Sequence, residues 1–233
     1  MKKIIVSSLM ATLFLLACKH EFLNSAINPT PVIVQGGTTG GGTTVSDTVC
    51  FQNDVLPLYV SYCASAGCHN ANTRADGVQT TDYTTIMKGI KPRDAANSKY
   101  YKEITKGEMP PRGYPALSTA QISLIKKWID QGALNTNCVN SCDTTKFTYS
   151  TSIQTILSNN CNGCHGVAPG SGNVYLGTLA ATQSYINANK QLFLDAINHA
   201  PSLPAAQRMP IGNPMDACKI KQMTKWINAG MPQ

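Results

Sequence analysis

Two short cysteine–histidine motifs carry the residue types and spacing that point most directly to chemistry. Residues 161–165 read Cys-Asn-Gly-Cys-His, and residues 63–69 read Cys-Ala-Ser-Ala-Gly-Cys-His, with four residues between the cysteines in place of two. Cys-x-x-Cys-His is the attachment site of a c-type haem. There the two cysteine sulfurs form thioethers with the haem vinyl groups, and the histidine binds the iron as an axial ligand. The sequence therefore predicts two c-type haems. Their predicted cysteine attachment points and histidine ligands are Cys63, Cys68, His69, Cys161, Cys164 and His165.

Two other interpretations of a Cys-x-x-Cys pair need weighing. It also occurs in zinc half-sites and in dithiol redox centres. A zinc site needs a matching second pair, and a thioredoxin-like dithiol needs a βαβ context, which this sequence lacks. The histidine directly after each second cysteine favours the haem interpretation.

Two Met-Pro dipeptides follow the motifs at similar distances. Met109 lies 40 residues after His69, and Met209 lies 44 residues after His165. Methionine opposite histidine is a cytochrome c ligand set that raises the reduction potential. We therefore predict Met109 and Met209 as the sixth iron ligands, the alternative being that they fill gaps in the core. His199 is a competing ligand for the second haem, which we interpret instead as a surface or loop histidine.

The two motifs lie within a longer internal repeat. Aligning Cys63 with Cys161, an offset of 98 residues, superimposes apolar positions before the motifs and near both carboxyl ends. The matched pairs include Val55/Ile153, Leu58/Ile156, Tyr59/Leu157, Ile122/Ile220, Ile125/Met223, Trp128/Trp226 and Ile129/Ile227. Spacings of three and four are typical of amphipathic helices. Each repeat is predicted to open with a helix that runs into the motif and to close with a helix that carries a tryptophan.

Capping residues refine these helices. Ser118 and Gln121 are typical of a capping box at the start of the first closing helix, and Pro214 suits the first turn of the second. Gly132 and Gly230 stand where these helices would stop. Further helices are predicted over residues 98–106 and from about 183 to 198. Strand alternation is scarce, so the predicted fold is all-α.

The amino terminus resembles a bacterial lipoprotein signal. Two lysines precede an apolar run, and Leu15-Leu16-Ala17-Cys18 resembles a lipobox, so we predict a cleaved signal over 1–17 and lipidation of Cys18. The alternative is an ordinary signal peptide. Residues 18–47, rich in glycine and threonine, are predicted to form a lipid-anchored flexible linker that spans on the order of 30 Å. Two or more acyl chains would anchor the protein stably to a membrane.

Composition limits the remaining possibilities. Residues 48–233 suit two small domains better than one large one, which we assign as 48–138 and 139–233. The formal net charge of +7 is offset by about four haem propionates, and no basic run or nucleic-acid motif occurs, so nucleic acid is not an expected partner.

Four cysteines remain beyond the motifs and Cys18. They are Cys50, Cys138, Cys142 and Cys218. An even number in an oxidising compartment suggests disulfides, and four cysteines allow three pairings. We favour Cys50–Cys138 and Cys142–Cys218, because each would join the start of one domain to its end, the alternative being buried free thiols.

Taken together, the two repeats resemble class I c-type cytochrome domains. The segment from Cys50 to Leu58, the Met-Pro loops and Lys127-Trp128-Ile129-Asp130-Gln131-Gly132-Ala133 carry this resemblance, which covers about residue 50 to the carboxyl end. It implies two tandem cytochrome c-like domains, each wrapped around one covalently bound haem, with His/Met ligation and one-electron transfer.

The expected function is that of a membrane-tethered dihaem cytochrome that relays electrons between redox partner proteins of the cell envelope. The expected location is the periplasmic side or the outer-membrane surface. This is an electron-transfer role without catalysis. The alternatives are a dihaem enzyme such as a peroxidase, which needs an open sixth position at one iron, and a haem-bearing interaction module of an envelope complex.

Overall fold

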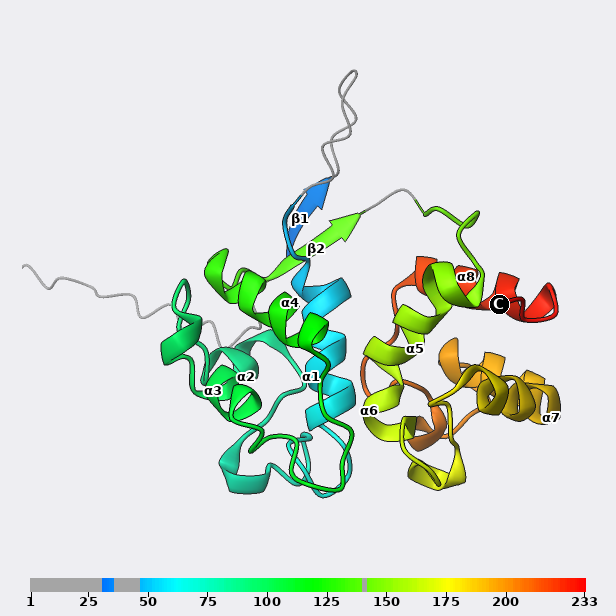
Figure 1. Ribbon diagram of the computed structural model, residues 1–233, viewed down its shortest axis with the longest axis horizontal. Helices are drawn as coiled ribbons and strands as arrows, with labels where there is room; N and C mark the ends of the chain where they lie inside the picture. Colours follow the sequence, from blue (N-terminus) through cyan, green and yellow to red (C-terminus); the bar gives the residue numbers. More distant parts are fainter. Residues whose placement is uncertain (1–30, 36–46, 140–141) are drawn as a thin grey trace, which may run out of the picture.

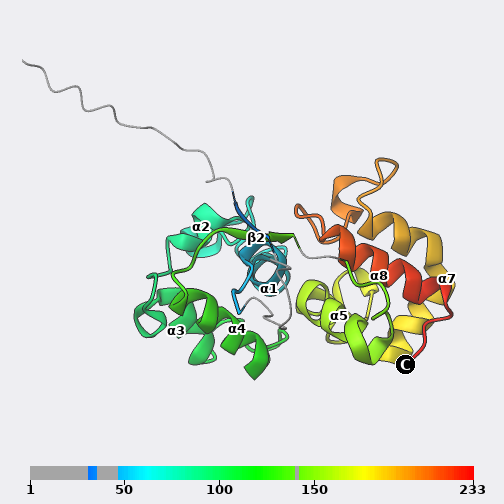
Figure 2. The same cartoon turned by 90° about the horizontal axis from the view of Figure 1, so that it is seen from above.

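The computed structural model describes residues 31–35, 47–139 and 142–233, and it is predominantly helical (Figure 1). Cys18, the predicted signal and most of the predicted linker lie outside the described residues. Figure 2, turned by 90°, shows the helices in two groups that lie side by side. The all-α class expected from the sequence is confirmed.

The first group contains four α-helices and the short turns between them. Its described elements are the π-helical turn η1 (Phe51–Val55), α1 (Leu56–Cys63), η2 (Ala75–Gly77), α2 (Tyr83–Met87), η3 (Ala95–Asn97), α3 (Lys99–Thr105) and α4 (Thr119–Asp130). Their apolar faces enclose one core, in which Phe51, Leu58, Ile86, Trp128 and Ile129 are almost fully buried. Phe51 stacks on Trp128 with ring centroids 5.1 Å apart, so the opening and closing helices meet across this core.

The second group repeats this arrangement and encloses a core of its own. Its elements are η4 (Tyr149–Ile153), α5 (Gln154–Asn160), α6 (Asn162–His165), η5 (Ser171–Asn173), α7 (Leu179–Ile197), η6 (Ala205–Gln207) and α8 (Ala217–Asn228). Ile153, Leu157, Ile186, Met223 and Trp226 are the most deeply buried members of the core.

The repeat extends to individual hydrogen bonds. The closing helices α4 and α8 have the same length and are offset by 98 residues, as the sequence predicts. Trp128 Nε1 donates to the Leu134 carbonyl at 3.0 Å, and Trp226 Nε1 donates to the Pro232 carbonyl at 2.8 Å, which is the same bond one repeat later. Gly132 follows α4 with a φ of +105°, the left-handed conformation that ends a helix.

The starts of the closing helices differ from each other. Ser118 and Gln121 form the predicted capping box of α4. Pro214 does not occupy the first turn of α8, because that helix begins at Ala217, where the Asp216 carboxylate accepts from the backbone N–H groups of Cys218 and Lys219. A capping carboxylate accepts hydrogen bonds from the free N–H groups of the first turn. A proline contributes only a φ angle that suits the first turn.

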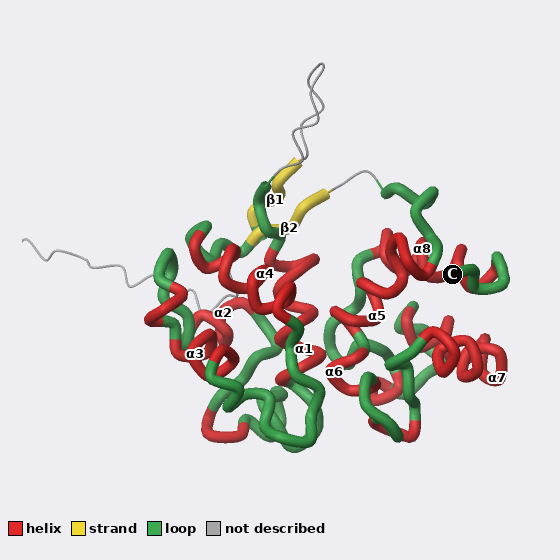
Figure 3. The backbone as a smooth tube through the Cα atoms, viewed as in Figure 1, coloured by secondary structure: helices red, strands yellow, loops and turns green. Residues whose placement is uncertain are grey.

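A short two-stranded sheet adds to the helices (Figure 3). The strand β1 (Val32–Gln35) pairs in parallel with β2 (Thr136–Val139), with Val34 opposite Cys138. The strand β1 lies within the segment predicted as linker. Its Val-Ile-Val-Gln sequence is rich in β-branched residues, which favour strands.

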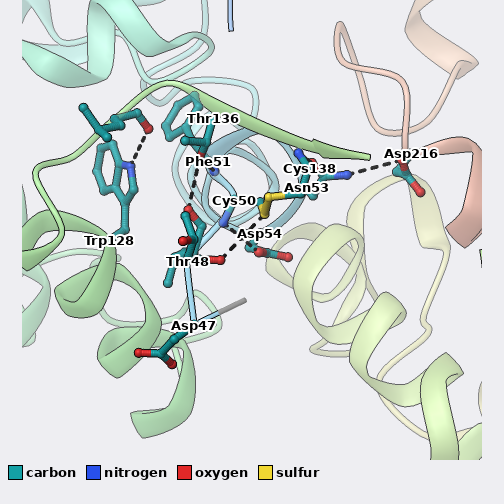
Figure 4. The surroundings of a disulfide bond; sticks show 12 residues. Asp47, Thr48, Cys50, Phe51, Asn53, Asp54, Trp128, Thr136, Cys138 and Asp216 are labelled. Atoms are coloured by element: carbon teal, nitrogen blue, oxygen red, sulfur yellow. Dashed lines mark hydrogen bonds between the residues drawn. A yellow bond between two sulfur atoms is a disulfide. The ribbon is translucent and has the colours of Figure 1, made fainter. Parts of the chain in front are cut away.

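The structure forms two disulfides, Cys50–Cys138 and Cys142–Cys218, with Cα–Cα distances of 5.7 and 5.3 Å. These are the two pairs favoured by the sequence. Figure 4 shows the first beside α1, where Asn53 Nδ2 donates across the boundary between the groups to the Asp216 carboxylate at 3.3 Å. Within the described residues, no helix is long and apolar enough to cross a bilayer.

Candidate functional site

The two cysteine–histidine motifs adopt the same backbone contact in spite of their different lengths. In the second motif, α6 follows α5 directly, and His165 N–H donates to the Cys161 carbonyl at 2.9 Å. In the first motif, α1 ends at Cys63, and His69 N–H donates to the Cys63 carbonyl at 3.0 Å. The two extra residues of the first motif therefore bulge outward, and each histidine still lies over its first cysteine.

The bulge of the first motif lies at the surface. Ala66 and Gly67 are exposed, Gly67 has a φ of +82°, and no atom lies within 4 Å of the position that a Cβ on Gly67 would occupy. The turn closes through a hydrogen bond from Cys68 N–H to the Ser65 carbonyl at 3.0 Å. A glycine with positive φ allows this reversal without steric strain.

Both imidazole rings are held by their Nδ1 atoms. His69 Nδ1 lies 3.0 Å from the Ala75 carbonyl oxygen, and His165 Nδ1 lies 2.9 Å from the Val174 carbonyl oxygen. Because a carbonyl oxygen only accepts, the proton must be on Nδ1 in each ring. The lone pair is then on Nε2, the tautomer and orientation seen in metal-binding histidines.

Burial favours the neutral form of the second imidazole. It lowers the pKa of His165, and hydrogen bonds to the carbonyl oxygens of Val174 and Ser171 act in the opposite direction. Neutral imidazole is the form that binds a metal ion.

A cavity of about 290 Å³ joins three of the predicted site residues in the first group. Cys63 at the end of α1, His69 in the motif and Met109 in the loop before α4 all line it. The other lining residues are Tyr59, Asp76, Val78, Thr80, Lys99, Tyr100, Glu103 and Ile104. The cavity wall is mostly apolar, and its charged side chains come from η2 and α3, so it suits an apolar ligand with a few polar substituents.

One buried polar atom of this cavity has no partner. Tyr59 is 2% exposed, and its hydroxyl makes no hydrogen bond within the described part of the chain. Burial also raises the pKa of this phenol, which keeps its proton. A buried hydroxyl without a partner is costly, so this site is suited to a ligand that carries an acceptor.

The methionine loops are anchored at corresponding places. Met109 N–H donates to the Glu103 carbonyl in α3 at 3.1 Å, and Met209 N–H donates to the Ala196 carbonyl in α7 at 2.9 Å. Both Met-Pro peptide bonds are cis. The structure places Met109 in one cavity with His69, and it places Met209 in the equivalent loop of the second group.

His199 takes part in the second of these loops. It follows α7 with a φ of +51°, and its Nε2 lies 3.0 Å from the Pro210 carbonyl oxygen. This agrees with its interpretation as a loop histidine, and it adds a contact to the Met-Pro segment that the sequence did not reveal.

The four motif cysteines are outside the disulfides. Burial raises the pKa of Cys63 to about 12 and that of Cys161 to about 12, with the neighbouring motif cysteine adding to each increase. Burial and then the nearby Cys68 raise the pKa of Cys164. Reactive dithiols depend on a lowered thiol pKa, so these values argue against a thioredoxin-like centre.

The sequence did not predict that two sets of residues near the motifs belong to the candidate sites. Tyr59, Lys99 and Glu103 line the cavity, although their types have no motif-like spacing. Ser61 and Gly163 make a close contact between the two groups, which only the folded chain brings together. Of these residues, Tyr59 already stood out in the sequence, because the repeat offset pairs this polar residue with the apolar Leu157.

Comparisons with known proteins find no matching family model, no matching curated protein and no matching solved structure. Among the described residues, no group of three or more histidine, cysteine, aspartate or glutamate side chains is arranged to hold a metal ion.

Proposed function

We propose that this chain is a dihaem c-type cytochrome that relays single electrons in the bacterial cell envelope. The observation that carries the proposal is the cavity lined by Cys63, His69 and Met109. A covalent attachment point and the two predicted axial ligands converge there from separate elements. The second motif supports a second haem through the matching His165–Cys161 backbone bond and the matching Nδ1 contact.

Three of the four residues predicted for the first site, Cys63, His69 and Met109, line one cavity, and their chemistry fits a c-type haem there. In the first site Cys63 and Cys68 would hold it, with His69 and Met109 as iron ligands. Tyr59 offers its unpartnered hydroxyl to an acceptor such as a propionate. In the second site the corresponding residues are Cys161, Cys164, His165 and Met209. When bound, such a group supplies an iron that cycles between its ferrous and ferric states.

The chain itself contributes orientation and exclusion of water. The carbonyl oxygens of Ala75 and Val174 fix the direction in which each imidazole presents Nε2. Apolar cores adjoin both motifs, with Cys63 packed against the first and Cys161 against the second. A low-dielectric surrounding and a methionine ligand both tune a reduction potential.

The location in the envelope follows from the same proposal. The two disulfides favour an oxidising compartment, and the lipobox-like Cys18 would tether the protein to a membrane. The expected partners are redox proteins that donate and accept single electrons. We propose no catalysed reaction.

The haem-to-protein ratio of the purified mature protein tests the function directly. We expect a ratio near two and an optical spectrum of six-coordinate low-spin iron with a methionine–iron band. A protein without covalent haem would overturn the proposal. A five-coordinate iron that turns over peroxide would favour a dihaem peroxidase instead. Co-purification with an envelope complex that persists after redox activity is lost would favour an interaction module.

A further inference from the structure

The second cysteine–histidine motif lies against α1, the helix that leads into the first motif. Figure 1 shows α6 beside α1 where the two groups meet, and these elements are in direct contact. Ser61, two residues before Cys63, is 5% exposed and lies at the centre of this contact.

Both polar groups of Ser61 bind the second motif. Its Oγ accepts a hydrogen bond from Gly163 N–H at 3.1 Å. Its carbonyl oxygen accepts one from the Cys164 thiol at 3.3 Å, a bond that is lost when Cys164 forms a thioether, because a thioether has no S–H proton. Gly163 and Cys164 are interior residues of the Cys-Asn-Gly-Cys-His motif. A helix of the first group therefore supplies a hydrogen-bond acceptor, Ser61 Oγ, to the predicted haem-attachment segment of the second.

The contact requires a glycine at position 163. A Cβ on Gly163 would lie 2.2 Å from the Ser61 carbonyl oxygen and 2.3 Å from the Ser61 carbonyl carbon. Both are backbone atoms of α1 and cannot rotate away. Any side chain at this position would push α6 and α1 apart, whereas Gly67 of the first motif faces open space.

Flanking hydrogen bonds close the contact. Tyr62 Oη donates to the Ser158 carbonyl at 3.0 Å, and the buried Gln121 Nε2 donates to Ser158 Oγ at 3.1 Å and to Asn159 Oδ1 at 2.9 Å. Buried polar networks that are satisfied on both sides hold two surfaces in a single register.

We propose that Ser61 and Gly163 are positioning residues through which α1 forms one wall of the second haem site. The inference rests on the proposed function. It means that the second site depends on the fold of the first group for its geometry. The two sites then share α1, and a substitution at Gly163, which lies in α6, acts on the second site first.

The test compares Ser61→Ala and Gly163→Ala with two controls in the full-length protein. Ser123→Ala changes an exposed residue of α4, and Thr155→Ala changes an exposed residue of α5, so each group carries one control outside the motifs. The measurements are haem occupancy of each motif from the masses of its proteolytic peptides, the reduction potential of each haem, and hydrogen exchange of the Gly163 amide.

Ser61→Ala should speed exchange of the Gly163 amide about tenfold, because that amide loses its acceptor. Gly163→Ala should lower haem occupancy of the second motif at least about twofold, or shift the potential of that haem alone. Both controls should match the wild type. If Gly163→Ala keeps wild-type occupancy and potential at the second site, the inference is wrong. If the wild-type protein carries no haem, the proposed function is wrong. If its Gly163 amide also exchanges rapidly, the contact between Ser61 and Gly163 is wrong as well.

Discussion

Met109 and His69 line the same cavity, although 40 residues separate them in the chain. The histidine comes from the turn after α1, and the methionine comes from the loop anchored on α3. The two residues therefore reach one cavity from different elements, which supports their proposal as a pair of axial ligands.

Replacing either methionine tests the ligand assignment. Met109→Leu should abolish the methionine–iron band of one haem and lower its reduction potential, because methionine ligation raises that potential. Met209→Leu should do the same at the other haem. Spectroelectrochemical titration measures both effects. The control is Met87→Leu, a conservative change in α2 away from the Met-Pro loops. An unchanged spectrum in both loop variants would contradict the assignment.

Removing the hydroxyl of Tyr59 should raise stability in the haem-free protein and shift a reduction potential in the haem-loaded protein. In the haem-free chain, Tyr59→Phe should raise the free energy of unfolding by about 1 kcal/mol, because a buried hydroxyl without a partner is removed. In the loaded protein it should shift the potential of the first haem only, since Leu157 occupies the equivalent position in the repeat. Urea denaturation and redox titration measure these effects. A shift of the second haem alone would contradict the placement.

The closing tryptophans should be the most sensitive core positions. Trp128→Ala and Trp226→Ala should each lower the free energy of unfolding by about 3–5 kcal/mol, because both side chains are almost fully buried. Each change also leaves a backbone carbonyl without its indole donor. Denaturation followed by circular dichroism measures the loss. Tyr114→Ala, at a residue 53% exposed, is the control and should change stability little. Equal losses of unfolding free energy in all three variants would contradict the burial of the two tryptophans in the cores.

The disulfides should contribute to stability independently of the haem sites. Cys50→Ala with Cys138→Ala opens a loop of 88 residues, which costs about 4.6 kcal/mol in the chain-entropy model. We expect a lower denaturation midpoint with unchanged haem occupancy. Loss of covalent haem from this variant would show that the disulfide is needed to form the site.

The stability of the haem-free chain should fall in mild acid because of His165. Burial lowers the pKa of its folded-state imidazole below the ordinary 6.5. The unfolded chain then binds more protons between the folded pKa and 6.5, so stability is lost as the pH falls through this window. His165→Gln should flatten the curve of unfolding free energy against pH. The same slope in variant and wild type would show that another group is responsible.

Local sequence patterns predicted the helical elements well but not the contacts between them. Ser118, Gln121, Trp128 and Gly132 define α4 through spacing and capping within one segment. The start of α8 was misplaced because Pro214 is compatible with a first turn, while the Asp216 side chain binds the free N–H groups. The strand β1 was missed because glycine and threonine dominate the segment around it.

The sequence allowed predictions about the candidate sites where the residues concerned lie close together in the chain. The cysteines and histidines of both motifs were predicted from spacing alone, and their role in binding haem stays a prediction. The contact of Ser61 with Gly163 could not be predicted in this way, because the two residues are far apart in the chain and neither type is unusual by itself. The unpartnered hydroxyl of Tyr59 likewise depends on the walls that surround it.

The two disulfides determine how the molecule would respond to mechanical tension. A pull applied at residue 47 reaches Cys50 after three residues and passes through the bond to Cys138. It then enters the second group at Cys142 and leaves through Cys218 toward the carboxyl end. Most of the first core lies inside its closed loop and off the path of the load, whereas α8, with the buried Met223 and Trp226, lies beyond Cys218 and bears it. A tethered molecule stretched from its ends would therefore lose α8 first, while the closed loop of the first group keeps that candidate site out of the load path.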